Sequence, residues 1–597
     1  MMHRVLLVAL LALGLSGSAP APAYAGPAAP GSHGGLGAWG RSGAAREGPP
    51  TVTAQDIRFT PGRSLRYGSA RDAGLLPGPI AALPADVARY MEPSPTLPLY
   101  PGAVVLAARD GVIAAHSAMG YALRYADDKP TELPADQWIA MREDTIFDLA
   151  SLSKLFTALA AVQQAERGAL DLDAPVAAYL PDFGQHGKDV ITVRQLLTHT
   201  SGLRPDLPFY NFPTRAEQQA ALFAESPQAA PGTAYIYSDL NLIALQLVLE
   251  RASGRSLDVL VRDDITRPLG MRDTGYNPAA SLRPRIAATE YEHAPPAQVD
   301  RGLVWGEVHD ENAWALGGVA GHAGVFATAH DLAVLAQTLL DGGRYGRARI
   351  LSEDGVRLLF TDFNEAFPRH SHGLGFELDQ RWYMDGLSSP VSAGHTGYTG
   401  TSLVIDPLSH SFVILLTNRV HPSRTWGSIN PARRAVARDL ARAVRVRPAR
   451  GRDAWFSQTA DGRTATLTVP VPAGAATVSF DLWYDTEETD VAALEASPDG
   501  RAWSPVPLSL RSGPYRWSVD GVVAGSGGRR WARAEAALPA GTTRLRWRYT
   551  TDPSQQGRGV YVDGVRIKDA GHTVVFDGER PHDAALFESD GWLRTTG

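Results

Sequence analysis

The pattern of hydrophobic and polar residues predicts strands at both ends of the first large region of the chain, with helices between them. From Pro101 the sequence reads PGAVVLAARDGVIAAHSAMGYA, two apolar runs around an Asp-Gly turn, which predicts a β-hairpin. Further along, TSLVIDP and SFVILLTN predict two more strands, and residues 433–446 form an amphipathic helical pattern. This arrangement predicts an α+β fold in which the terminal strands and a terminal helix pack together.

Two helices are expected between these strands or close to them. One covers residues 85–91, with Pro84 at the helix start, where proline is tolerated. The other begins at Ser151 and runs through LFTALAAVQQAERGAL to a glycine-containing stop.

After residue 448 the pattern changes to short alternating segments such as TATLTVPV, ATVSFDLWY and TTRLRWRYT, separated by turns like Pro-Asp-Gly. Residues 453–597 are therefore predicted to form an antiparallel β-sandwich. Seven of the thirteen tryptophans lie here. Packing in the core of the sandwich is the favoured role for most of them, and stacking on cell-wall sugars is the alternative.

The N-terminus has the pattern of an export signal. A positively charged MMHR, the apolar VLLVALLALGL and an Ala-Tyr-Ala cleavage motif predict a signal peptide over residues 1–25 and a secreted protein. Residues 26–50 are rich in Gly and Pro and predict a flexible leader. A first folded domain over 51–448 and a second over 453–597 complete the predicted organisation.

Composition narrows the classes of function. The 597 residues carry 57 basic and 63 acidic side chains, a net charge of −6, so nucleic-acid binding is not indicated. The chain has no cysteine, which excludes disulfides, thiolate nucleophiles and cysteine zinc sites. No segment of the mature chain approaches the about 18 apolar residues of a transmembrane helix. The oligomeric state is left open.

The stretch FDLASLSKLFTAL places Ser151 and Lys154 three residues apart at a helix start. On a helix the hydroxyl and the amine then share one face, and a buried amine with a lowered pKa could accept the proton of an attacking serine. In YIYSDLNL, Tyr237 is a plausible general acid or base, with its pKa lowered by a nearby ammonium. The Gly-rich GHTGYTG, from Gly394, enters a strand and could supply an oxyanion hole.

Taken in this order, the SxxK, YSD and HTG motifs resemble the serine β-lactamase and penicillin-binding-protein superfamily, and its class C-like branch of D-alanyl-D-alanine carboxypeptidases and esterases most of all. The phrases LLTHTSGL, DLDAPVAAYLPDF, PLGMRDTGY and GTSLVIDP are similar as well, and the resemblance covers roughly residues 80–445. It implies an antiparallel sheet flanked by helices, together with a helical subdomain.

The resemblance also implies roles for individual residues. Ser151 would be the acylated nucleophile, Lys154 its proton acceptor and Tyr237 the relay to the leaving group. The backbone N–H groups of Ser151 and Tyr398 would form the oxyanion hole. The implied substrate-contacting residues are Asp239, His395, Thr396, Gly397 and Tyr398.

Two positions depart from the family pattern. Asp239 stands where many relatives have Asn, so it accepts hydrogen bonds but does not donate them unless protonated, and it could instead pair with Lys154 and raise the pKa of that lysine. His395 replaces a lysine that suits the carboxylate of β-lactams and D-Ala-D-Ala termini, so efficient β-lactam hydrolysis is not expected.

Other candidate sites have weaker support. The segment HDENAWALGGVAGHAG, with His309, Asp310, Glu311 and His322, is expected to be a structured active-site loop rather than a metal site. Arg419 could hold a substrate carboxylate or lie on the surface. The C-terminal region resembles the sandwich modules of immune-inhibitor-type metalloproteases, where Asp485, Glu487 and Asp563 could bind calcium or be ordinary turn carboxylates.

The sequence thus predicts a secreted serine hydrolase that needs no cofactor and no metal. The favoured substrate is a D-alanyl peptide of the peptidoglycan type, with a small ester or weak β-lactam hydrolysis as the alternative. A non-catalytic cell-wall binding protein is the alternative of another class, in which Asp239 and His395 would be signs of lost chemistry.

Overall fold

The computed structural model describes residues 46–60, 63–93 and 97–597, and residues 45–597 form one compact unit. The predicted signal peptide and residues 26–45 of the predicted leader lie outside the described residues. The end of that leader differs from the prediction, because β1 (Arg46–Glu47) pairs in parallel with β23 (Tyr515–Val519). No helix in the described part of the chain is long and apolar enough to cross a membrane.

The main sheet of the first region has eight strands. Seven of them follow the order β13-β14-β15-β16-β3-β4-β2, and β5 pairs with β4. Their bounds are Glu377–Leu378 (β13), Ala393–Gly397 (β14), Thr401–Asp406 (β15), Ser411–Thr417 (β16), Gly102–Arg109 (β3), Val112–Leu123 (β4), Arg66–Tyr67 (β2) and Ile139–Ala140 (β5). The predicted hairpin is confirmed, with Asp110 and Gly111 at φ 52° and 78° in the turn. Strand β16 pairs with β3, so the two ends of the region meet in one sheet as predicted.

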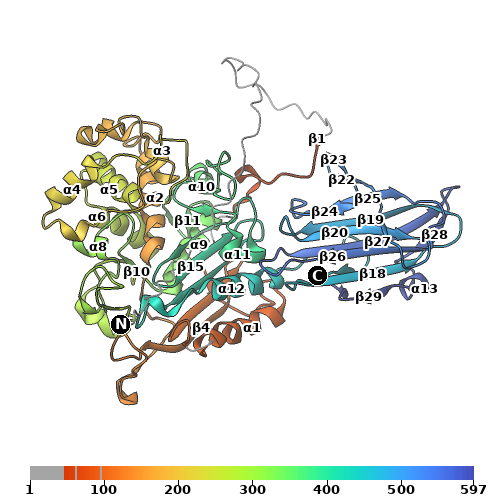
Figure 1. Ribbon diagram of the computed structural model, residues 1–597, viewed down its shortest axis with the longest axis horizontal. Helices are drawn as coiled ribbons and strands as arrows, with labels where there is room; N and C mark the ends of the chain where they lie inside the picture. The colour runs from red at the N-terminus through yellow and green to blue at the C-terminus, as the bar shows by residue number, and fades with distance from the viewer. Residues whose placement is uncertain (1–45, 61–62, 94–96) are drawn as a thin grey trace, which may run out of the picture. The chain divides into compact units, whose positions relative to one another are not determined.

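Helices cover both faces of this sheet because alternate strand residues point to opposite sides. On one face, Val105 of β3 packs with α1 (Pro77–Ala88) and α12 (Asn430–Ala443), which lie close together in Figure 1. On the other face, Val104 packs with α2 (Ser153–Glu166) and α9 (Ala329–Leu340). The helix expected over residues 85–91 begins earlier, with Pro77 at its first turn and Pro84 inside it.

Between strands β5 and β13 of the main sheet, the chain forms a mainly helical region. It includes α3 (Val193–Leu197), α4 (Arg215–Ala224), α5 (Asp239–Ser253), α6 (Leu257–Val261) and α8 (Glu311–Ala315). A small sheet joins β6 (Phe147–Asp148), β10 (Val325–Ala327) and β7 (Gly275–Tyr276). Strand β6 leads directly to Ser151, and β10 directly follows the loop of residues 309–324, which contains His309 and His322. Because β6 and β10 are paired, Ser151 and this loop lie beside each other.

Residues 454–595 form two further sheets that share one hydrophobic core, which confirms the predicted β-sandwich. Phe480 of one sheet meets Trp547 of the other edge to face, with ring centroids 5.3 Å apart. The first sheet contains β17 (Ala454–Phe456), β19 (Ala475–Asp485), β22 (Leu508–Ser512), β23, β25 (Ala532–Ala537), β27 (Gly559–Asp569), β28 (Val574–Asp577) and β30 (Leu593–Thr595), together with β1. The second contains β18 (Thr464–Pro470), β20 (Val491–Ser497), β21 (Ser504–Pro505), β24 (Val522–Val523), β26 (Arg544–Thr550) and β29 (Glu588–Asp590).

A buried arginine joins the sandwich to the main sheet. The Arg529 guanidinium lies 2.7 Å from a carboxylate oxygen of Asp406, at the end of β15, and 2.7 Å from one of Asp485, at the end of β19. All three side chains are almost completely buried, and the two carboxylates raise the pKa of Arg529 although burial opposes this.

Candidate active site

The position of Ser151 is set by a tight turn between β6 and α2. The buried carboxylate of Asp148 accepts hydrogen bonds from the backbone N–H of Ala150 at 2.9 Å and of His309 at 2.6 Å. Ala150, directly before the serine, has φ 48°, a left-handed conformation that costs free energy for a residue with a Cβ. Strain of this kind persists only where surrounding contacts enforce it and is concentrated at functional sites.

Ser151 and Lys154 are brought together as the helical spacing predicts. The Nζ atom of Lys154 donates to the Ser151 hydroxyl oxygen at 2.8 Å and to the His322 carbonyl at 3.2 Å. The same ammonium lies 2.7 Å from a carboxylate oxygen of Asp239, at the start of α5. Lys154 is 1% exposed, so a hydroxyl, a carboxylate and a carbonyl replace its water shell.

The charge state of Lys154 differs from the simplest expectation. Burial alone would lower the pKa of this lysine, as expected for a base that accepts the serine proton. The Asp239 carboxylate and the Tyr237 phenol outweigh burial, so the pKa of Lys154 lies above its ordinary value. The structure therefore has the alternative arrangement, in which Asp239 pairs with the lysine and holds the proton on it.

Tyr237 closes the group on its other side. Its ring centroid lies 4.9 Å from Lys154 Nζ, and its side chain lines one pocket together with Ser151. The expected lowering of the Tyr237 pKa by the ammonium is outweighed, because burial raises this pKa more than Lys154 lowers it. Both Lys154 and Tyr237 therefore carry their protons in the resting site at neutral pH.

The opposite wall of the site is formed by the end of β14. His395 is 2% exposed, and its Nδ1–H donates to the Thr396 carbonyl at 2.7 Å. Burial, assisted by the charge of Lys154, lowers the pKa of His395 to about 3, so it is neutral and supplies no fixed charge. Strand β13 is the edge strand of the sheet, but it is short and pairs with β14 only at Ala393 and Gly394. The next residues of β14, from His395 to Gly397, therefore have no strand of the described part of the chain on that side and form the free edge of the site.

Tyr398 stands at the mouth of the site with 51% of its surface exposed. Its ring stacks on His309 with centroids 5.8 Å apart, and the Arg419 guanidinium lies 4.6 Å from its centre. No backbone carbonyl of the described residues accepts its N–H, which leaves that group available to a ligand. The oxyanion-hole role of Tyr398 stays a prediction.

Two pockets meet at Ser151 and Tyr398. One, of about 650 Å³, also contains Tyr237, Glu377, Trp382 and the β14 wall, together with the arginines Arg419, Arg424 and Arg433. The other, of about 460 Å³, contains Arg204, Tyr210, Asp239, Asp310 and Arg424. Ser151 can thus contact two parts of a substrate, one in each pocket.

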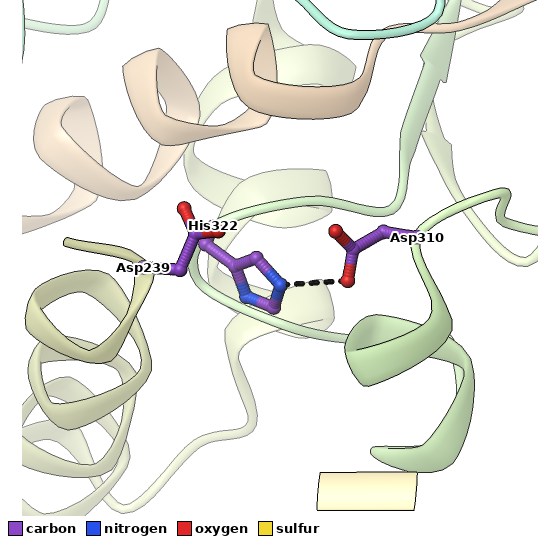
Figure 2. A group of neighbouring side chains, drawn as sticks. All are labelled: Asp239, Asp310 and His322. Atoms are coloured by element: carbon purple, nitrogen blue, oxygen red, sulfur yellow. Dashed lines mark hydrogen bonds and ion pairs between the residues drawn. The ribbon is translucent and has the colours of Figure 1, made fainter. Parts of the chain in front are cut away.

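The residues considered as metal ligands divide into two groups. His322 Nε2 lies 2.9 Å from a carboxylate oxygen of Asp310, and Figure 2 shows this pair beside Asp239. Polar atoms of Asp239, Asp310 and His322 all lie within 4.8 Å of one another, but the ammonium of Lys154 already supplies a cation to Asp239. This arrangement favours a structured active-site loop over a metal site.

The second group is buried behind Tyr398. His309 Nε2 lies 2.8 Å from Glu290, and Arg424 pairs with Glu290 and Glu311 at 2.7 and 2.6 Å. Glu292 lies within 4.8 Å of the same histidine and carboxylate atoms and pairs with Arg301 at 2.6 Å. Because two arginines and His309 pair with the three carboxylates, this network holds His309 and Arg424 in place around Tyr398.

The three calcium-ligand candidates of the C-terminal region do not form one group. Asp485 pairs with Arg529, and Asp563 accepts the N–H of Arg450 and of Gly564. Only Glu487 belongs to a carboxylate cluster, with Asp490 and Asp552 as its neighbours.

Several pocket residues were missed by the sequence analysis. Glu377 lies in a two-residue strand without a recognisable pattern, and Arg433 was seen only as part of an amphipathic helix. Arg424 follows the last strand of the main sheet, five residues after Arg419. No motif in the sequence would have selected these three side chains.

The antiparallel sheet between helix layers, with a serine and a buried lysine at the start of α2, defines a serine hydrolase of the β-lactamase and penicillin-binding-protein fold. A family model described as Beta-lactamase matches residues 87–438, which is more than half of the chain. The protein therefore belongs to the Beta-lactamase family.

Several known proteins are similar to this chain. The chain is 32% identical over 363 residues to a protein of Salmonella agona (strain SL483) named "Putative D-alanyl-D-alanine carboxypeptidase", covering 56% of this chain and 82% of that protein. Among solved structures, a penicillin-binding protein homologue from Caulobacter crescentus is 22% identical, with a TM-score of 0.47, covering 62% of this chain and 99% of its own. The hydrolase EstCE1, described as having promiscuous acyltransferase activity, is 24% identical, with a TM-score of 0.46, covering 60% and 99%.

Proposed function

We propose that this protein is a secreted D-alanyl peptidase of the D-Ala-D-Ala carboxypeptidase type, acting through an acyl-enzyme on Ser151. The observation that carries the proposal is the hydrogen bond between Ser151 and the buried Lys154, next to Tyr237, at the junction of two pockets. A structural lysine does not need a hydroxyl, a phenol and a carboxylate around its ammonium. The relative from Salmonella agona supports this substrate class by its name.

In the proposed reaction, the Ser151 oxygen attacks the carbonyl carbon of the scissile peptide bond. The serine proton passes to the Lys154–Tyr237 pair once that pair has lost a proton, and Tyr237 then delivers a proton to the leaving amine. The N–H groups of Ser151 and Tyr398 stabilise the oxyanion. Water, as the second nucleophile, releases the acyl group and restores the serine.

Arginines take over the recognition of the substrate carboxylate in this proposal, because His395 is neutral. Arg433 donates to the carbonyls of Gly397 and Thr401 but forms no ion pair with a carboxylate among the described residues. Burial and the neighbouring Arg419 lower the pKa of Arg433 to about 10, the sign of a cation without enough negative charge around it. A C-terminal carboxylate in this pocket would supply that charge.

The test is release of D-alanine from an N-acylated peptide ending in D-Ala-D-Ala, measured by a D-amino-acid assay. The matched control is the same peptide ending in L-Ala-L-Ala. We expect release from the first peptide only. Hydrolysis of p-nitrophenyl acetate without D-alanine release would favour the second candidate, a carboxylesterase, which the absence of a cationic side chain at position 395 also supports. Binding of wall peptide without any turnover would favour a non-catalytic binding protein.

The ion pair of Asp239 with Lys154 predicts an unusual pH dependence. The pKa of Lys154 is raised by Asp239, so kcat/KM should rise with pH on the alkaline side as the Lys154–Tyr237 pair loses a proton. Asp239→Asn removes the raising charge and leaves burial, which lowers the pKa. The rising limb should therefore move to lower pH by about one unit or more.

The measurement is kcat/KM for p-nitrophenyl acetate between pH 5 and 10, corrected for spontaneous hydrolysis. Asp354→Asn, an exposed carboxylate on α10 (Glu353–Leu359), is the control for loss of one negative charge. A rising limb that stays in place in Asp239→Asn would contradict the assignment of this limb to Lys154.

A further inference from the structure

One carboxylate stands apart in the larger pocket beside Ser151. Glu377 lines this pocket together with Ser151 and Tyr237, whereas the other charged side chains of its lining are arginines. Its backbone pairs with Gly394 on β14, so the side chain lies next to the strand that forms the free edge of the site.

The Glu377 carboxylate lacks a sufficient partner inside the protein. Its Oε2 atom is buried and meets the geometry of a hydrogen bond with none of the described residues, and the hydroxyl of the neighbouring Tyr383 is also buried and unpaired. Burial raises the pKa of Glu377 to about 7, although Tyr383, Arg433 and Lys154 all act in the opposite direction. A buried carboxylate that remains this poorly compensated is costly, and a donor supplied by a ligand would remove the cost.

The surroundings of Glu377 select the kind of donor. Trp382 lines the same pocket, and the pKa of Tyr235 is raised by burial and, to a smaller extent, by the charge of Glu377. An aromatic side chain beside a carboxylate is the combination that binds an alkylammonium group, through cation–π attraction and charge-assisted hydrogen bonds. The arginines of this pocket, by contrast, attract a carboxylate.

We propose that Glu377 forms an ammonium-binding subsite, so that a primary amine from a neighbouring part of the peptide binds in this pocket beside the C-terminal carboxylate. This inference rests on the proposed function for the identity of the pocket as the substrate pocket. It adds a substrate class to that function, namely peptides with a free amino group near the scissile bond.

A binding experiment tests the subsite without requiring turnover. The two probes are 5-aminopentanoate and pentanoate, which have the same chain and differ in the amine. Calorimetric titration of the wild type should give a dissociation constant about tenfold lower for 5-aminopentanoate, as expected for a hydrogen-bonded ion pair. In Glu377→Gln the two constants should agree within about twofold, and Glu377→Asp should keep part of the preference.

Glu365→Gln, an exposed glutamate in a loop, is the matched control and should keep the full tenfold preference. Thermal unfolding of each variant without ligand shows whether it is folded. Equal binding of the two probes to the wild type, or a full preference in Glu377→Gln, would overturn the proposal.

A second readout separates this inference from the proposed function. Both probes should slow labelling of Ser151 by a fluorophosphonate in the wild type, with 5-aminopentanoate effective at about tenfold lower concentration. If Ser151 is never labelled but 5-aminopentanoate still binds in a Glu377-dependent way, the subsite stands and the serine-hydrolase role of Ser151 fails. If Ser151 is labelled and neither probe discriminates, the subsite fails alone.

Discussion

Ser151→Ala and Lys154→Met are each expected to lower kcat/KM for p-nitrophenyl acetate by about 10³-fold or more, and the double variant by no more than the larger single effect. The two side chains share one hydrogen bond of 2.8 Å, so removing either one removes the activated nucleophile. Residues that act as a unit give effects that are far from additive. Stopped or continuous absorbance assays on the three variants measure these ratios.

Lys188→Met is the matched control for loss of a buried lysine. Lys188 is 0% exposed, and its Nζ donates to backbone carbonyls, including that of Phe223, so it resembles Lys154 in burial but is absent from the site. Its activity per folded molecule should stay within about twofold of the wild type. If the two single losses multiplied in the double variant, the serine and the lysine would not act as a unit. A Lys154→Met variant that kept more than a tenth of the wild-type activity would contradict the prediction as well.

Arg529→Met is expected to destabilise the protein by about 3–5 kcal/mol, the usual result of removing one partner from a buried ion pair. The substitution keeps much of the side-chain volume but leaves the buried carboxylates of Asp406 and Asp485 without the guanidinium that lies 2.7 Å from each. Because these residues belong to the main sheet and the sandwich respectively, the loss should affect the unfolding of both.

Urea unfolding followed by tryptophan fluorescence measures this change, since tryptophans are found in both parts of the chain. The neighbouring Arg530, whose side chain is 56% exposed and 3.9 Å from Asp56, provides the control variant Arg530→Met. Its effect should stay below about 1 kcal/mol, as for surface ion pairs. Similar stabilities for the two variants would contradict a role of the buried arginine in joining the sheets.

How far the sequence predicts this structure depends on how local each feature is. The Asp-Gly hairpin and the approach of Ser151 to Lys154 follow from periods of two and 3.6 residues, which can be seen in a short segment. The proximity of Tyr237 and His395 to them is not local, and only the order of three known motifs indicated it. Their individual roles stay predictions until the variants are measured.

Electrostatic properties were less predictable than positions. The sequence shows a lysine in an apolar helix, which suggests a lowered pKa, but the sign of the shift depends on the 2.7 Å contact with Asp239, a residue 85 positions away in the chain. Glu377 illustrates the same limit, because its place in the pocket follows from a two-residue pairing with β14 that no pattern reveals.

The left-handed conformation of Ala150 has a consequence for protein engineering. Glycine adopts φ 48° without strain, so Ala150→Gly would relieve the folded state but would also increase the entropy of the unfolded chain. A screen for heat resistance alone would have little reason to keep alanine here. A screen that also selects for turnover would favour alanine, because its methyl group restricts the backbone that positions the Ser151 hydroxyl. The residue found at position 150 after laboratory evolution would therefore show whether stability alone or catalytic activity as well had been selected.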